Sequence, residues 1–118
     1  MHLLNFDAGA GCRIGLLNGE EVIDLTSAGL PQSLDDLVGA DDLVEWVENA
    51  ASRSKSRVAC SDIRYLPPII NARKGIAVGL NCVDHAAEAN FEPPEFPVLF
   101  SRFPSSWVGH QEGLAAPK

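Results

Sequence analysis

The sequence predicts an α+β protein with two parts: a small β-meander with two helices, followed by the start of a second domain that is β-rich, with mixed sheets. Three observations lead to this prediction. Short apolar strands near the N-terminus alternate with glycine turns, apolar residues then recur at helical spacing, and Leu66-Pro67-Pro68 marks a boundary. We therefore expect a small N-terminal region over residues 1–66 and the beginning of another domain over residues 67–118.

The meander is predicted to consist of strands at residues 2–6, 13–17 and 21–25. A glycine-rich turn at residues 8–11 separates the first two strands. Between the last two, Asn18-Gly19 is a strong signal for a two-residue hairpin. The apolar side chains of these strands are expected to form a small core made of Ile14, Leu16, Val22, Ile23 and Leu25.

Two helices are predicted after the meander. Ser33 is placed to cap a first helix at residues 34–38. A second helix is expected at residues 41–52, with an apolar stripe made of Leu43, Val44, Trp46, Val47 and Ala50. In this stripe we expect Trp46 to anchor the core and not to serve as a platform for a ligand. Residues 52–61 are polar, which indicates a mobile connection.

The composition limits the classes of function. With 118 residues, 46% of them apolar, the chain can bury a core. The formal charge of -7 disfavours nucleic acid and anionic membrane as partners, because both need clustered Lys and Arg. An acidic substrate would need a locally positive site. The three cysteines form no C-x-x-C motif, and no leader or membrane-spanning run is present, so we expect a reducing, cytoplasmic location.

Two strands are predicted in the second part, at residues 75–80 and 97–101. Gly75 and Gly79 would weaken a strand, so they indicate a bulge or the close approach of another backbone. The second strand is almost continuously apolar and is expected to be buried on both faces. Residues 91–95 form a proline-rich link that is either a lid over a site or a plain connector.

A histidine and a glutamate lie three residues apart between these strands, where a turn at Asn81 is predicted to start a helix. This spacing puts His85 and Glu88 on one face of the helix. The carboxylate can fix the imidazole tautomer and favour its protonated form, which is the arrangement that a general base needs. Many solvated helices carry such a pair, so the residues alone leave both a catalytic dyad and an ordinary exposed helix face open.

The dyad belongs to a longer pattern made of Gly79-Leu80-Asn81, Asp84-His85-Ala86, Glu88-Ala89, Pro97-Val98-Leu99-Phe100, Ser105-Ser106 and Val108-Gly109-His110. In order and spacing it resembles the fumarylacetoacetate hydrolase family, with its G-L-N-Y-x-D-H-A-x-E-A, E-P-V-L-F and P-S-S-x-x-G motifs. The resemblance implies the start of a fumarylacetoacetate-hydrolase-like catalytic domain. It also implies a metal-dependent enzyme that acts on 2-oxo acids or 1,3-dicarbonyl acids. Residues 1–66 resemble, more loosely, the small region that precedes this domain.

The resemblance also implies roles for individual residues. His85 and Glu88 would activate a water or move a proton, and substrate would be bound by Asn81, Arg102, Ser105 and Ser106. Arg102 can hold a substrate carboxylate with two parallel hydrogen bonds, although a surface salt bridge is an alternative. Where the family usually has tyrosine after Asn81, this chain has Cys82, which removes a hydroxyl group.

A divalent metal ion, Mg or Mn, is expected from the resemblance. It would chelate the 2-oxo and carboxylate oxygens and stabilise an enolate. The family holds this ion with an E-x-E pair and a later aspartate, so we expect no metal ligand within this chain. His110-Gln111-Glu112 is predicted to be a loop and not a metal site. We further expect either a longer polypeptide or a second chain to complete the sheet, and a homodimer by resemblance.

Several functions remain open at this point. The simplest is hydrolysis of a carbon–carbon bond in an acylpyruvate-type 2-oxo acid. Isomerase, decarboxylase and hydratase activities on related acids are close alternatives, because all of them share the metal-bound enolate. An inactive N-terminal fragment and a small interaction module are the non-enzymatic alternatives.

Overall fold

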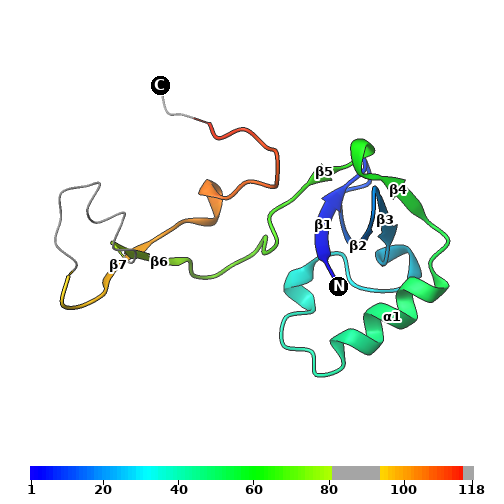
Figure 1. The fold of residues 1–118 in the computed structure, drawn as a ribbon, viewed down its shortest axis with the longest axis horizontal. Coiled ribbons are helices and arrows are strands. Elements are labelled where there is room, and N and C mark those ends of the chain that lie inside the picture. The colour runs from blue at the N-terminus through cyan, green and yellow to red at the C-terminus, as the bar shows by residue number, and fades with distance from the viewer. Residues whose placement is uncertain (81–93, 116–118) are drawn as a thin grey trace. The chain divides into compact units, whose positions relative to one another are not determined.

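The computed structural model describes residues 1–80 and 94–115 (Figure 1). Contacts divide the chain into a first unit, Met1–Asn71 with Val108–Lys118, and a second unit, Ala72–Trp107. The described residues are rich in strands and contain one α-helix, which confirms the predicted α+β class. Short 3₁₀ turns join these elements: η1 (Thr26–Ala28), η2 (Leu34–Asp36), η3 (Cys60–Asp62) and η4 (Pro104–Ser106).

An antiparallel sheet forms the first unit, with five strands in the order β4-β3-β2-β1-β5. Its strands are β1 (Leu3–Asp7), β2 (Cys12–Asn18), β3 (Glu21–Asp24), β4 (Arg57–Ala59) and β5 (Arg64–Tyr65). The three strands of the predicted meander are therefore confirmed. The prediction that residues 52–61 form a mobile connection is wrong, because β4 pairs with β3 in this stretch, with Val58 opposite Val22.

The hairpin between β2 and β3 has a two-residue loop, as predicted, but its position differs by one residue. Asn18 pairs with Glu21, so the loop consists of Gly19 and Glu20. Gly19 has a φ of 65°, in the left-handed region. Type II′ turns place glycine at the first loop position, and Gly19 occupies that position here.

The core of the first unit lies between the sheet and the helix α1 (Leu43–Arg53) (Figure 1). The cluster of buried side chains consists of Ile14, Ile23, Leu25, Leu37, Val47 and Ala50. Of the predicted helical stripe, Leu43 is partly buried against this cluster, whereas Val44 and Trp46 are exposed, Trp46 by 46%. The prediction that Trp46 anchors the core is wrong, because Val47 faces the core and Trp46 lies about 100° around the helix from it.

The first predicted helix, at residues 34–38, is a single 3₁₀ turn, so this prediction is wrong in length. The capping role of Ser33 is confirmed, since its Oγ accepts a hydrogen bond from the Asp35 N–H at 3.1 Å. The Asp35 carboxylate accepts hydrogen bonds from the N–H groups of Ile70 and Asn71, at 2.9 and 2.8 Å. These hydrogen bonds attach residues 70–71 to the turn, which does not continue as a helix.

The proline segment after β5 is fixed to the first unit by Asn5. This side chain is completely buried, and its Nδ2 donates to the carbonyl oxygens of Pro67 and Pro68 at 3.0 and 3.1 Å. Its Oδ1 accepts from the Leu34 N–H at 2.9 Å. Contacts thus group residues 67–71 with the first unit, whereas the domain boundary after residue 66 stays a prediction.

The second unit is built on an antiparallel hairpin of β6 (Ile76–Gly79) and β7 (Val98–Ser101). Both strands lie where they were predicted. The expected burial of the second strand on both faces is wrong, because all four residues of β7 are exposed. A two-stranded sheet has no second layer of its own to cover its faces. Every strand pairing in the described parts of the chain is antiparallel, and none of the helices described there could span a bilayer.

Candidate functional site

The open end of the β6–β7 hairpin brings Gly75 and Arg102 together. The Arg102 N–H donates to the Gly75 carbonyl oxygen at 2.8 Å. A Cβ atom on Gly75 would lie 2.6 Å from the Arg102 carbonyl oxygen and 2.7 Å from Cζ2 of Trp107, so only glycine fits. The predicted close approach is confirmed at Gly75. At Gly79 a Cβ atom would make ordinary contacts, the nearest at 3.5 Å.

A hollow of about 200 Å³ lies at this end of the hairpin and carries three positive side chains. It is lined by the cations Arg73, Lys74 and Arg102 and by Gly75, Ile76, Ser101, Phe103 and Pro104. Arg73 and Lys74 precede β6, and Arg102 follows β7. Because the two strands are antiparallel, these positions lie at the same end of the hairpin. We call this feature the cationic hollow.

The Arg102 guanidinium lies over an aromatic ring, with its carbon 5.8 Å from the centre of the Phe100 ring. Such a cation–π contact orients the guanidinium and leaves N–H groups for an anion. The two ion pairs in the described residues join Arg13 to Asp24 and Arg64 to Asp7. Within that part of the chain, the surface salt bridge considered for Arg102 is therefore not formed.

Arg73 and Lys74 were not predicted as site residues. The strands predicted at residues 75–80 and 97–101 carry no local signal that they pair with each other. Pairing them as an antiparallel hairpin would have placed the cations before the first strand beside Arg102 after the second. An anion in the hollow would relieve the repulsion among these like charges, which is a physical reason to expect binding there.

Ser105 and Ser106 belong to the turn η4, directly after the last residue that lines the cationic hollow. The Ser106 hydroxyl donates to the Phe103 carbonyl oxygen at 2.7 Å, and its N–H donates to the same oxygen at 2.9 Å. The hydroxyl proton is thus engaged within the chain. Ser105 is exposed, and the substrate-binding roles of both serines stay predictions.

Asn81, His85 and Glu88 lie outside the described residues, as do Cys82 and most of the proline-rich link. Leu80, the last described residue before Asn81, has a φ of 53°, which is unusual for a leucine. Strained backbone of this kind tends to gather at functional sites. The strain lies one residue before Asn81, where the sequence predicts the start of the site.

The segment His110-Gln111-Glu112 forms a turn in the first unit, as predicted. The His110 ring packs edge-on against Tyr65, with 5.3 Å between ring centres and an angle of 84° between the rings. Gln111 has a φ of 65°. In residues 1–80 and 94–115, no group of three or more His, Cys, Asp or Glu side chains is placed to hold a metal ion.

The fold and the cationic hollow together define an α+β protein with a site suited to small organic anions. Comparisons with known proteins then give its family, although no family model matches the chain. The mitochondrial oxaloacetate tautomerase FAHD2A of Bos taurus is 32% identical over 124 residues, covering 99% of this chain and 40% of that protein. Fumarylacetoacetate hydrolase domain-containing protein 2 of Pongo abelii is 31% identical with the same coverage.

A solved structure agrees with these relatives. The crystal structure of a protein described as HpcE from Mycobacterium smegmatis matches with a TM-score of 0.75 and 34% identity. The match covers 99% of this chain and 41% of that one. The chain belongs to the fumarylacetoacetate hydrolase family, as its motifs predicted. It spans about 40% of the length of the two curated relatives named above.

Proposed function

We propose that this chain is part of an enzyme that moves a proton within a small 2-oxo acid and so interconverts its keto and enol forms. The observation that carries the proposal is the 32% identity, over 99% of the chain, to a protein named as an oxaloacetate tautomerase. The cationic hollow supports it independently. Oxaloacetate bears two carboxylates, and the hollow offers Arg73, Lys74 and Arg102 in a chain whose formal charge is -7.

In this proposal Arg102 holds one substrate carboxylate through two parallel hydrogen bonds, and Arg73 and Lys74 add positive potential beside it. His85, oriented by Glu88, takes a proton from the carbon next to the 2-oxo group. A proton is then returned to the enolate oxygen, so the substrate is isomerised and no atom is lost. The roles of His85 and Glu88 rest on their spacing and on the family motif.

A divalent metal ion, Mg or Mn, remains an expectation from the family. When bound, it would polarise the 2-oxo group. The described residues do not form a site for it, and its ligands are expected elsewhere. We also expect a further stretch of polypeptide or a second copy of the chain to complete the enzyme, with a homodimer as the simplest arrangement.

Hydrolysis of a carbon–carbon bond in an acylpyruvate-type acid is the second candidate. It is favoured by the same His85 and Glu88 pair, because a carboxylate-held imidazole can also activate a water molecule. Two assays separate the candidates. Loss of the ultraviolet absorbance of enol-oxaloacetate reports tautomerisation, and release of pyruvate from an acylpyruvate reports hydrolysis.

The substitution His85→Ala tests both candidates. We expect it to lower whichever rate the protein shows by about 100-fold or more, the usual size of a general-base effect. His2→Ala is the matched control, since His2 is an exposed histidine in the first unit and should leave the rate within about twofold. An unchanged rate in His85→Ala would remove the dyad from the mechanism.

A further inference from the structure

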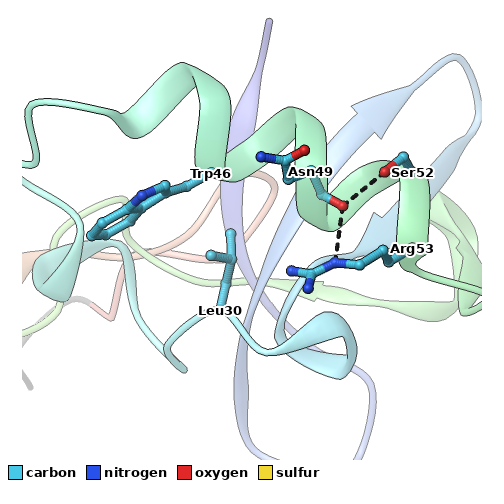
Figure 2. Close-up of a pocket in the computed structure, with 5 residues that line it drawn as sticks. All are labelled: Leu30, Trp46, Asn49, Ser52 and Arg53. Carbon is cyan, nitrogen blue, oxygen red and sulfur yellow. Dashed lines mark hydrogen bonds between the residues drawn. The ribbon is translucent and has the colours of Figure 1, made fainter.

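A second hollow, of about 450 Å³, lies on the first unit beside α1 (Figure 2). Four of its residues come from α1, and Leu30 comes from the loop after η1; those from the helix are Trp46, Asn49, Ser52 and Arg53. Small-molecule sites in proteins usually measure about 300–1,000 Å³. None of these residues lines the cationic hollow.

The indole of Trp46 forms one side of this hollow, with Leu30 between it and Arg53 in the view of Figure 2. Trp46 is 46% exposed although it directly precedes the buried Val47. A half-exposed indole next to a leucine offers a flat apolar surface. An aromatic ring gains most from such a surface, because it can stack on the indole while it buries apolar area.

Arg53 supplies the polar end of the hollow. It follows Trp46 by seven residues, about two helical turns, and side chains on a helix lean toward its N-terminus. Its Nε donates to the Asn49 carbonyl oxygen at 3.2 Å, and its Nη2 donates to the Ala28 carbonyl oxygen at 3.4 Å (Figure 2 shows the first). These two bonds orient the guanidinium, which has five N–H groups and therefore keeps donors for a ligand.

Two further groups can adjust to a ligand. The Ser52 hydroxyl donates to the Asn49 carbonyl oxygen at 2.8 Å and still has lone pairs with which to accept. The exposed Asn49 side chain has both a donor and an acceptor. Each of the two ion pairs that the structure describes involves another arginine, so in that part of the chain Arg53 has no carboxylate partner.

The acids on and before α1 disfavour a ligand with more than one negative charge. The helix carries Glu45 and Glu48, and Asp41 and Asp42 directly precede it, so Arg53 is one cation among several acids. A doubly charged phosphate would be repelled by these acids more strongly than a carboxylate would.

We propose that this hollow binds an aromatic carboxylate, whose ring stacks on Trp46 and whose carboxylate is held by Arg53. The ligand class is thus an aryl-substituted short-chain acid with one negative charge. Its site lies on residues that the family motifs do not include.

The experiment follows the indole N–H signals by NMR while 3-phenylpropanoate is added to the 118-residue chain. The chain has two tryptophans, Trp46 and Trp107, and Trp46→Phe assigns their signals. We expect a saturable shift of the Trp46 signal. The neutral alcohol 3-phenylpropan-1-ol is the matched ligand, and it should bind about tenfold more weakly because it lacks the charge-assisted hydrogen bond.

Arg53→Gln should weaken the binding of 3-phenylpropanoate by about the same tenfold, whereas Lys55→Gln, which removes a nearby exposed cation, should leave it within twofold. The proposal is overturned if the Trp46 signal does not shift saturably in the parent chain. It is equally overturned if acid and alcohol bind alike, or if the two variants bind the acid alike. The ligand comparison uses the parent chain, so it remains decisive if Arg53→Gln does not fold.

Discussion

The two units of this chain differ in how completely they bury their apolar side chains. In the first unit, five strands form one sheet and a helix covers the core, so residues such as Phe6, Ile14 and Leu25 are completely buried. In the second unit, the strands β6 and β7 pair with one another, and large apolar side chains such as Leu99 remain exposed.

This difference in burial suggests that the first unit supplies most of the stability, whereas the second carries the candidate site. The first unit meets its polar requirements internally, since no buried side-chain nitrogen or oxygen in the described residues lacks a partner. The second unit has less buried structure but carries the cationic hollow and most residues of the family motif. We therefore expect substitutions in the first unit to change the free energy of unfolding. Substitutions of the cations Arg73, Lys74 and Arg102 at the open end of the hairpin should chiefly change the binding of anions.

The largest expected effect compares two leucines. Leu25→Ala should lower the free energy of unfolding by about 2–5 kcal/mol, because Leu25 is completely buried and its removal leaves a cavity. Leu99→Ala should change it by no more than about 0.5 kcal/mol, because Leu99 is 63% exposed. Urea denaturation followed by circular dichroism measures both values. If both substitutions lowered the free energy of unfolding equally, Leu99 would have to be buried by a partner, and the contrast between the two units would not hold.

An intermediate effect compares two glycines of the second unit. In Gly75→Ala the new methyl group should displace the Arg102 backbone and the Trp107 ring from residue 75. We expect this to weaken the pairing of β6 with β7 by about 1–3 kcal/mol. Gly79→Ala should be tolerated, because its new methyl group would make only ordinary contacts. Amide hydrogen exchange of residues 76–79 and 98–101 reports the pairing. Equal exchange rates in both variants would show that the close approach at Gly75 is not required.

The smallest expected effect concerns Asp35. Burial opposes ionisation of this carboxyl, but hydrogen bonds from Ser33 and from the N–H groups of Ile70 and Asn71 outweigh it, so the pKa of Asp35 lies below its usual value. A lowered pKa in the folded state gives stability that is fully present above the unfolded pKa of about 3.9. This stability is lost as the pH falls through the folded pKa.

Asp35→Asn should therefore destabilise the chain near pH 7, and the difference from the parent should shrink below about pH 4. Urea midpoints at a series of pH values measure it. Asp36→Asn, at the exposed neighbouring position, is the matched control. A difference that stays constant down to pH 2 would show that the carboxylate charge does not hold the segment after β5.

Local patterns in the sequence predicted most of the elements. Alternating apolar residues and glycine turns located the strands β1 to β3, and the apolar runs located β6 and β7. The strand β4 was missed because residues 52–61 look polar locally. Its pairing with β3 brings together residues about 36 apart, as for Val22 and Val58, and no local pattern encodes such a contact.

Buried polar groups were the second source of error. Ser54 looked like part of an exposed connection, yet it is buried and its Oγ donates to the Asp24 carbonyl oxygen at 2.7 Å. In the candidate site, the motif led to Arg102, whereas Arg73 and Lys74 became visible only through the pairing of the two strands. The exposure of Trp46 depended on the direction of α1 relative to the core, which periodicity alone gives only to within a broad stripe.

The central claim is that the cationic hollow binds the carboxylate of a 2-oxo acid. Isothermal titration with oxalate, a dianion that resembles the acidic end of such a substrate, tests it without added metal. We predict saturable binding to the parent chain, about tenfold weaker in Arg102→Gln and unchanged in Lys55→Gln. Equal affinity in the parent and in Arg102→Gln would contradict the claim, because the main carboxylate contact of the hollow would then contribute nothing.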